Sequence, residues 1–498
     1  MIRNRFSCYC ILCAMLGLAL VWLLFITPTT VHAQGPKGPV SFIDDVAPIL
    51  QKNCFACHDA KKKKGKLEMT TWENFRKGGS KDDPIVPGKS KDSYLIDVLT
   101  SAGANRMPPK DAGDALKKEQ IAIIAKWIDE GAKLDKGVDV KADLVRELRV
   151  RWNPPQPFVS YKFPTLINAL AFTPDSKQLV VGGNHELTVW DIATGKLVRR
   201  VFTRAERAHA MAFLPDGKLV VAGGRPGQEG DVRIYDINAG KAKDFGGVPS
   251  VDGVNDKAVL LKELIQVDDS ILALAISSDG KKLAAGGTDR MVRVFDIASG
   301  KLEHAVENHA DWILGVAFTP DAKALVTASR DKTAKVWDLA NKESLLTFPD
   351  HQNIVNNVAM TPDGKFGLSA GEDGSIRIWQ ATDMAKAIGK ATKTLPGHTK
   401  AVFRLANYPD AKNPMVASCS ADMTVRLWNP VAGTALKTLS GLTDWVYACA
   451  ISPNGELVAG GAANGEVRVW KTSDGMPAGS FNATPGYVAP KTAEAPKK

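Results

Sequence analysis

Two cysteines and a histidine lie together in one short stretch of the sequence. The five residues from Cys54 to His58 read CFACH. A CxxCH motif supports three kinds of chemistry: covalent attachment of a haem, a zinc site, or a redox-active dithiol. In the first, each thiol adds to a vinyl group of the porphyrin and the histidine ligates the iron.

The surrounding sequence favours haem attachment. A structural zinc ion needs four ligands, but the next histidine is His185 and the next cysteine is Cys419. A thioredoxin-type pair opens a helix within a βαβ unit, whereas Cys54 and Cys57 close a helical pattern that has no evident flanking strands. We therefore predict one covalently bound haem c, attached through Cys54 and Cys57, with His58 as an iron ligand.

A methionine is the expected sixth ligand, because Met/His ligation is common in cytochromes c. Two methionines, Met69 and Met107, lie in the same segment. Met107 stands in the stretch RMPPK, where two prolines stiffen the loop, while Met69 follows His58 too closely to reach the opposite face. Met107 is the predicted ligand. By analogy with small cytochromes, the Pro87 carbonyl is the predicted acceptor for the His58 ring.

Four consecutive lysines, Lys61 to Lys64, follow the motif. A basic rim beside a haem edge steers an acidic redox partner without tight binding. The alternative is a solvated loop that keeps a small domain soluble, and the sequence leaves both interpretations open.

The motif lies in a predicted domain over residues 42–134. It opens with an apolar pattern at helical spacing that includes Val46, Ile49 and Leu50. It closes with a predicted helix over Leu116–Ala132, whose apolar stripe consists of Ile121, Ile124, Trp127 and Ile128. Two helices and a long loop bury little surface, so a cofactor would help to stabilise them. Residues 135–163 are predicted to be a linker, with one short helix near residues 142–150.

From residue 164 to 482 the sequence repeats with a period of about 42 residues, which is typical of WD40 blades. Each unit closes on an aromatic residue; the endings are VWD (189–191), IYD (234–236), VFD (294–296), VWD (336–338), IWQ (378–380), LWN (427–429) and VWK (469–471). Seven endings predict seven blades and a closed propeller. An excess of residues, roughly 241–263, is interpreted as a long inter-blade loop. The closing strand is either near Phe158–Phe163 or at Gly479–Asn482.

Three units carry a fuller pattern, in which an aspartate precedes the tryptophan by six residues; the sets are His309, Asp331 and Trp337; His351, Asp373 and Trp379; His398, Asp422 and Trp428. The resemblance to WD40 proteins implies that these residues form buried hydrogen-bond networks rather than catalytic sites, since buried polar groups must be paired.

Four blocks in order, DVAPILQKNCFACH, IVPGKSKDSYL, RMPPK and IIAKWIDEGA, resemble the planctomycete-type cytochrome c domain. The resemblance implies a monohaem cytochrome with Cys54 and Cys57 as thioether donors and His58 and Met107 as axial ligands. The expected architecture is a small all-α, class I-like cytochrome c domain followed by an all-β, seven-bladed WD40 β-propeller.

Residues 1–33 are typical of a secretory signal, with Arg3 and Arg5 before an apolar run and a cleavage site after Ala33. The run is also long enough for an uncleaved membrane anchor. We expect a periplasmic or cell-envelope protein. Cys419 and Cys449 are predicted to be buried thiols, and residues 483–498 a disordered tail.

The formal net charge of +10 is spread thinly, and no base-reading motif occurs, so nucleic acid is not an expected partner. We interpret the chain as an exported cytochrome that exchanges single electrons with a redox protein. An acidic surface on that partner would complement the lysines, and the propeller would dock a second, unknown protein. No catalytic residue is assigned. Two alternatives stay open: an oxidoreductase with a second cofactor or substrate site in the propeller, and a non-redox interaction protein with a structural haem.

Overall fold

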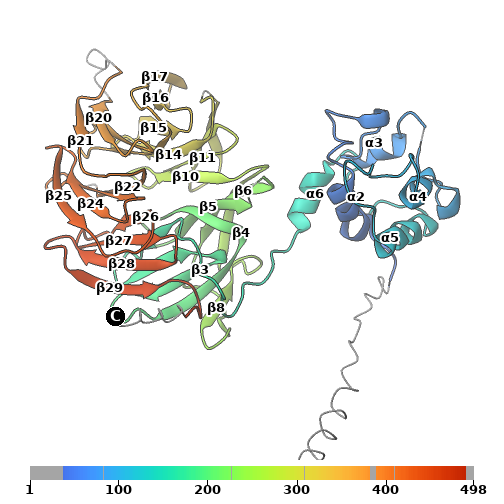
Figure 1. Cartoon of the computed structure of the whole chain (residues 1–498), viewed down its shortest axis with the longest axis horizontal. Coiled ribbons are helices and arrows are strands. Elements are labelled where there is room, and N and C mark those ends of the chain that lie inside the picture. Colours follow the sequence, from blue (N-terminus) through green and yellow to red (C-terminus); the bar gives the residue numbers. More distant parts are fainter. Residues whose placement is uncertain are drawn as a thin grey trace, which may run out of the picture. The chain divides into compact units, whose positions relative to one another are not determined.

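The computed structural model describes residues 38–81, 83–225, 227–307, 309–381, 389–408 and 410–488. The chain divides into two compact units, the first ending at Trp152 and the second beginning at Asn153. The first holds the helices and the second holds the strands (Figure 1). The predicted signal segment lies outside the described residues. No helix in the described part is long and apolar enough to cross a membrane.

The first unit is built from short helices: α2 (Ala47–Asn53), α3 (Trp72–Lys77), α4 (Tyr94–Thr100), α5 (Lys118–Asp129) and α6 (Leu144–Arg151). A π-helical turn (Phe42–Val46) leads into α2, and 3₁₀ turns lie at Lys64–Lys66 and Ser90–Asp92. The predicted closing helix is present as α5 but is shorter at both ends. It ends just before Gly131, whose φ of 102° suits glycine at a helix C-terminus.

Aromatic side chains join these helices into one core. The ring of Phe42 lies 4.7 Å from that of Trp72 and 5.1 Å from that of Trp127, measured between centroids. Trp127 is fully buried on α5 together with Ile124 and Ile128, and its indole N–H donates to the Lys133 carbonyl at 3.0 Å. The apolar stripe predicted for this helix is therefore its buried face.

The structure corrects the predicted linker over residues 135–163. Leu144 and Leu148 of α6 are buried in the core of the first unit. The Asp143 side chain caps α6 by accepting from the backbone N–H of Val145 at 2.8 Å, and the Leu144 N–H donates to the Thr70 carbonyl. Residues up to Trp152 belong to the first unit because α6 uses its apolar face there.

The second unit is the predicted seven-bladed propeller, with four antiparallel strands per blade in the described part of the chain. The first two blades share one long strand; together they contain β1 (Leu170–Phe172), β2 (Gln178–Gly182), β3 (Asn184–Asp191), β4 (Leu197–Phe213), β5 (Leu219–Arg225), β6 (Glu229–Tyr235) and β9 (Leu260–Val267). The start of β4 pairs with β3 and its end pairs with β5.

The five remaining blades follow in chain order (Figure 1). They are formed by β10 (Ile271–Ile276) to β13 (Leu302–Glu307), with β11 (Lys282–Gly287) and β12 (Met291–Asp296); β14 (Ile313–Phe318), β15 (Ala324–Ser329), β16 (Ala334–Asp338) and β17 (Glu343–Phe348); β18 (Val355–Met360), β19 (Phe366–Gly371), β20 (Ile376–Gln380) and β21 (Lys393–Leu395); β22 (Val402–Tyr408), β23 (Met415–Ser420), β24 (Val425–Asn429) and β25 (Thr434–Leu439); β26 (Val446–Ile451), β27 (Leu457–Ala462), β28 (Glu466–Lys471) and β29 (Pro477–Asn482).

The excess residues are not the predicted inter-blade loop, because they lie within the second blade, between β6 and β9. They include a hairpin of β7 (Lys243–Asp244) and β8 (Pro249–Asp252). The strand β8 runs parallel to β4, with Arg200 opposite Ser250, and β9 already begins at Leu260. The insertion therefore extends the double blade rather than leaving it.

The ring closes through the second of the two candidate segments, because β29 pairs with β28. Phe481 of β29 stacks on Trp190 of the first blade at 5.0 Å, and Thr484 accepts from the Thr165 N–H at 2.9 Å. Residues 483–488 therefore pack on the propeller, which corrects the predicted start of a disordered tail. Residues 489–498 lie outside the described part.

The stretch Phe158–Phe163 forms no strand but is tied to the first blade. The Arg200 guanidinium donates to the Phe158 carbonyl at 2.6 Å and forms a buried ion pair with Glu186. The Tyr161 hydroxyl donates to the same Glu186 carboxylate at 2.7 Å. This segment, predicted to be linker, is thus part of the second unit.

The three His–Asp–Trp sets form the expected networks, each completed by a hydroxyl. In the fourth blade, the Trp337 indole donates to Thr327 at 2.9 Å, Thr327 lies 2.7 Å from His309, and His309 donates to Asp331 at 2.8 Å. Ser369 and Ser418 take the place of Thr327 in the next two blades. Burial alone raises the pKa of Asp331, but hydrogen bonds from His309 and Thr333 outweigh it and hold that pKa below its usual value.

We expect Asp331→Asn to lower the free energy of unfolding by about 1 to 3 kcal/mol at neutral pH, because His309 loses a charged acceptor. A depressed folded-state pKa gives stability that is present above pH ~4 and is lost as the pH falls further. The difference from the natural protein should therefore shrink below pH ~4 in denaturant titrations. The exposed Asp311→Asn in the same blade is the control. A difference that stays constant down to pH ~3 would contradict this account.

Candidate functional site

The CFACH motif forms a tight turn at the end of α2. The Cys54 N–H donates to the Leu50 carbonyl at 2.8 Å, and the His58 N–H donates to the Cys54 carbonyl at 3.1 Å. Pro48 in the first turn and the buried Ile49 and Leu50 fix α2 in the core. The helix thereby delivers the motif to one place on the first unit.

That place is a cavity of about 280 Å³, lined mostly by apolar side chains. The lining residues are Cys54, His58, Lys64, Gly65, Leu67, Met69, Gly79, Ser80, Lys81, Pro84, Tyr94, Leu95, Val98 and Met107. Three of the four predicted site residues therefore meet at one cavity, and Cys57 lies in the same turn. Tyr94, Leu95 and Val98 come from α4 and form one wall of the cavity. No motif in the sequence indicates that α4 lines the cavity.

The His58 ring is held by a backbone carbonyl, but not the predicted one. Its Nδ1 lies 3.3 Å from the Leu67 carbonyl oxygen. A carbonyl only accepts, so Nδ1 carries the proton and Nε2 keeps its lone pair. The prediction of Pro87 was wrong because the chain folds straight back after the motif: the Met69 N–H donates to the His58 carbonyl at 2.8 Å.

Both methionines of the segment line the cavity, from different parts of the chain. Met69 is fully buried and its backbone is bonded to that of His58. Met107 is 38% exposed, and its N–H donates to the Val98 carbonyl of α4 at 2.9 Å. Met107 thus comes from the α4 side of the cavity, whereas Met69 comes from the His58 side.

The Cys54 thiol has the wrong environment for a redox dithiol. Burial, with a smaller effect of Cys57, raises the pKa of Cys54 to about 12. Reactive CxxC pairs need the opposite, a lowered thiol pKa. Among the described residues, no three His, Cys, Asp or Glu side chains group closely enough to hold a metal ion by themselves.

The four lysines after the motif have different roles. The Lys62 ammonium donates to the Ala56 carbonyl at 2.7 Å, and Lys63 pairs with Glu68 at 2.7 Å. Lys64 instead lines the cavity, as does Lys81, whose ammonium lies 5.0 Å from the ring centre of Tyr94. Part of the lysine run therefore stabilises the turn, and part of it carries charge to the cavity.

This arrangement fits a covalently attached haem. Two thiols directly precede a histidine whose Nε2 is free to bind iron. The Met107 side chain lines the same cavity, and most of the wall is apolar. The partly exposed Met107 and Tyr94 at its border leave one side of the cavity open to solvent.

Comparison with protein families supports each unit separately. Residues 54–111 match the model of the planctomycete cytochrome C family. Residues 148–388 match the N-terminal domain of nucleolar protein 10-like proteins, and residues 389–429 and 433–471 match the WD domain, G-beta repeat.

Curated relatives resemble short stretches of this chain. Human coronin-7 is 38% identical over 81 residues, which are 16% of this chain and 9% of coronin-7. Nuclear distribution protein nudF of Aspergillus flavus is 30% identical over 89 residues, 18% of this chain and 20% of nudF. The chain thus spans at most about a fifth of the length of either relative.

The resemblances predicted from the sequence are therefore confirmed for both units. A planctomycete-type cytochrome c domain implies binding of haem c, and a WD40 propeller implies interaction with other proteins. This chain combines a planctomycete-type cytochrome c domain with a WD40 β-propeller.

Proposed function

We propose that this chain is an exported monohaem cytochrome c that transfers single electrons, and that its propeller docks a protein partner. The observation that carries the proposal is the meeting of Cys54, His58 and Met107 at one apolar cavity of the first unit. When bound, haem c supplies reversible one-electron transfer at its iron.

The residues of the first unit have distinct roles in this proposal. Cys54 and Cys57 would hold the haem through thioether bonds, and His58 Nε2 and the Met107 sulfur would bind its iron. The hydrogen bond from His58 Nδ1 to the Leu67 carbonyl fixes the orientation of the ring and raises its basicity as a ligand. The apolar walls limit the access of solvent to the site to its open side, and solvent access is one of the factors that tune the reduction potential.

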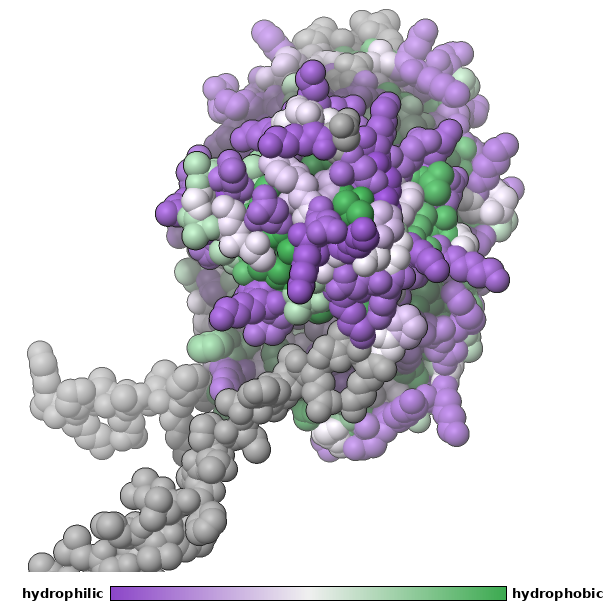
Figure 2. Space-filling model, turned by 90° about the vertical axis from the view of Figure 1, so that its right-hand side faces the viewer, coloured by the Kyte–Doolittle hydropathy of each residue, from purple (hydrophilic) through white to green (hydrophobic). Residues whose placement is uncertain are grey.

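The lysines at the cavity supply a charged rim. Lys64 and Lys81 both line it, and cations beside an exposed redox edge raise the encounter rate with an anionic partner. The side chains that face the viewer in Figure 2 are mostly hydrophilic, and the hydrophobic ones among them form small separate patches. Such a surface suits short-lived electrostatic encounters better than a permanent apolar interface.

The propeller carries exposed aromatic side chains suited to protein contacts. Trp312 is 40% exposed with the Arg330 guanidinium 4.7 Å from its ring, and Trp445 is 44% exposed. Phe403 and Tyr447 stack beside Trp445 at 4.4 Å. Tryptophan, tyrosine and arginine are the residues most enriched at interface hot spots, which supports the proposed docking role.

We expect Met107→Leu to abolish the sulfur-to-iron charge-transfer band of the oxidised protein and to lower its reduction potential, because a thioether ligand raises that potential. Visible spectra and a redox titration of the haem-loaded protein provide the measurement. Met69→Leu is the matched control, since it makes the same volume-conserving change at the same cavity. Loss of the band in Met69→Leu alone would show that the ligand assignment is wrong.

We expect the double variant Lys64→Glu/Lys81→Glu to react at least about tenfold more slowly with ferricyanide at low ionic strength, and faster with the cationic hexaammineruthenium oxidant. Stopped-flow kinetics over a range of salt concentrations measures both rates. Lys118→Glu/Lys133→Glu carries the same charge change away from the cavity. Equal effects of the two double variants would refute local steering by the rim.

We expect the full chain, expressed with a haem c maturation system, to be exported and cleaved after Ala33. Intact mass and N-terminal sequencing should then give Gln34 as the first residue. A chain that keeps residues 1–33 and stays in the membrane fraction would establish the uncleaved anchor instead. Full-length, haem-free protein confined to the cytoplasm would rule out both forms of export.

A further inference from the structure

The innermost strands of the seven blades surround a central cavity of about 510 Å³. The pairing of each innermost strand with its neighbour shows which residues occupy equivalent positions in the seven blades. At one such position six blades carry a small or short side chain; these residues are Ala169, Ala210, Ala273, Gly315, Asn357 and Ala448. The sixth blade has Arg404 at that position. The small residues leave space in the channel, and the guanidinium occupies part of it.

A repeated irregularity marks the mouth of the channel. In six innermost strands, β4 included, the pairing register shifts just before this position. A bulge re-aims the side chain of the extra residue. The residues so placed include His209, Asn356, Phe403 and Tyr447, and they line a second cavity of about 170 Å³. Arg404 and His209 line both cavities, so they stand between the mouth and the interior.

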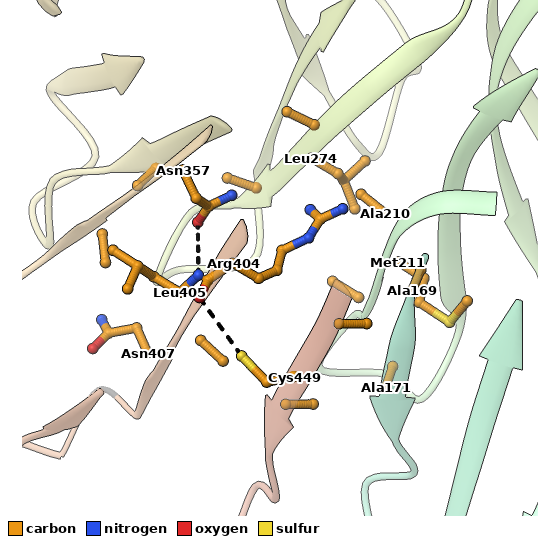
Figure 3. A pocket seen from close by; sticks show the side chains of 18 of the residues that line it. Ala169, Ala171, Ala210, Met211, Leu274, Asn357, Arg404, Leu405, Asn407 and Cys449 are labelled. Atoms are coloured by element: carbon orange, nitrogen blue, oxygen red, sulfur yellow. Dashed lines mark hydrogen bonds between the residues drawn. The ribbon is translucent and has the colours of Figure 1, made fainter. Parts of the chain in front are cut away.

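Arg404 is the one charged side chain among the described residues that line these two cavities. It extends from β22 toward Leu274 and Ala210 (Figure 3). Its Nη2 donates to the His209 carbonyl at 2.5 Å and to the Asn168 carbonyl at 3.3 Å. No carboxylate pairs with it in the part of the chain that the structure describes. Arg404 is partly buried, and a cation that is withdrawn from water and held only by carbonyl dipoles is costly.

Neutral polar groups accompany this cation. Burial, then Arg404 and Arg207, lower the pKa of His209 to about 4, so its imidazole is neutral at physiological pH. The Nε2 atom of His209 is buried and has no hydrogen-bond partner. Asn357 accepts from the Leu405 N–H at 3.2 Å through its side-chain oxygen. The channel thus combines one cation, an unpaired imidazole nitrogen and small aliphatic side chains, in a lining that also exposes asparagine side chains and polar backbone.

We propose that the propeller channel binds a small organic carboxylate, whose oxygens pair with the Arg404 guanidinium and whose short apolar body contacts the aliphatic walls. A guanidinium offers a planar fork of donors that matches a carboxylate. A single cation matches the charge of a monoanion, whereas a phosphate group, with a charge of about −1.5 to −2 and three strong acceptor oxygens, would leave charge and acceptors unpaired here. The cavity volume lies within the range of small-molecule sites.

The first test uses the unaltered full-length protein with three probes: sodium butanoate, neutral butanamide of the same shape, and inorganic phosphate. Calorimetry should show one butanoate site per chain, and butanamide and phosphate should bind at least about tenfold more weakly, since neither combines a single negative charge with a hydrocarbon body. Butanoate should also raise the midpoint of thermal unfolding. Equal binding of butanoate and butanamide, or no butanoate binding, overturns the proposal even if no variant folds.

The second test removes the charge. Arg404→Gln keeps an amide that can donate to the channel carbonyls but should abolish the preference for butanoate over butanamide. Arg290→Gln is the matched control, because Arg290 is half exposed and pairs with Glu307 away from the channel. Butanoate binding retained in Arg404→Gln, or lost equally in Arg290→Gln, also overturns the assignment.

Discussion

The packing of Phe42 against Trp72 and Trp127 is the contact on which the first unit depends. It joins the turn before α2 to α3 and α5, three elements distant in sequence. A seven-residue helix such as α2 is too short to persist alone in water. Its stability, and with it the position of the CFACH turn, therefore comes from this aromatic core. The cavity walls and the ligand histidine follow from where that helix ends.

The sequence was sufficient to predict those features that depend on residues close together in the chain. The CFACH spacing, the RMPPK stretch and the apolar stripe of α5 each predict their structure from neighbouring residues, and the structure brings Cys54, His58 and Met107 to one cavity. The acceptor for His58 was missed because a backbone carbonyl leaves no mark on residue type. Leu67 serves only because the lysine-rich loop folds back, and that depends on contacts such as Lys63 with Glu68.

In the propeller, the sequence repeat predicted the blades. Aligning the blades with one another also identifies single positions, such as the hydroxyl residues of the networks and Arg404, that no blade reveals alone. The hydroxyl residues that complete the networks stand ten positions before each tryptophan, as Thr327 does before Trp337. They were overlooked because they lie in small-residue strands where serine and threonine are unremarkable. Arg404 is equally inconspicuous until the seven inner strands are placed in register. The sequences of α6 and of the β7–β8 hairpin do not recur elsewhere in the chain, so no repeat pattern could predict what they pack against.

The continuous strand β4 has a consequence for how this ring could be cut and rejoined. In the part of the chain that the structure describes, each blade is made of strands that are consecutive in the sequence apart from the β7–β8 insertion, and the first and last blades exchange no strand. The two ends of the propeller lie close together, since the Thr165 N–H donates to Thr484. A short peptide linker could join them there, and new chain ends between two neighbouring blades would then leave each sheet complete. Only the junction of the first two blades resists such a circular permutation, because a cut there divides a strand that both blades share.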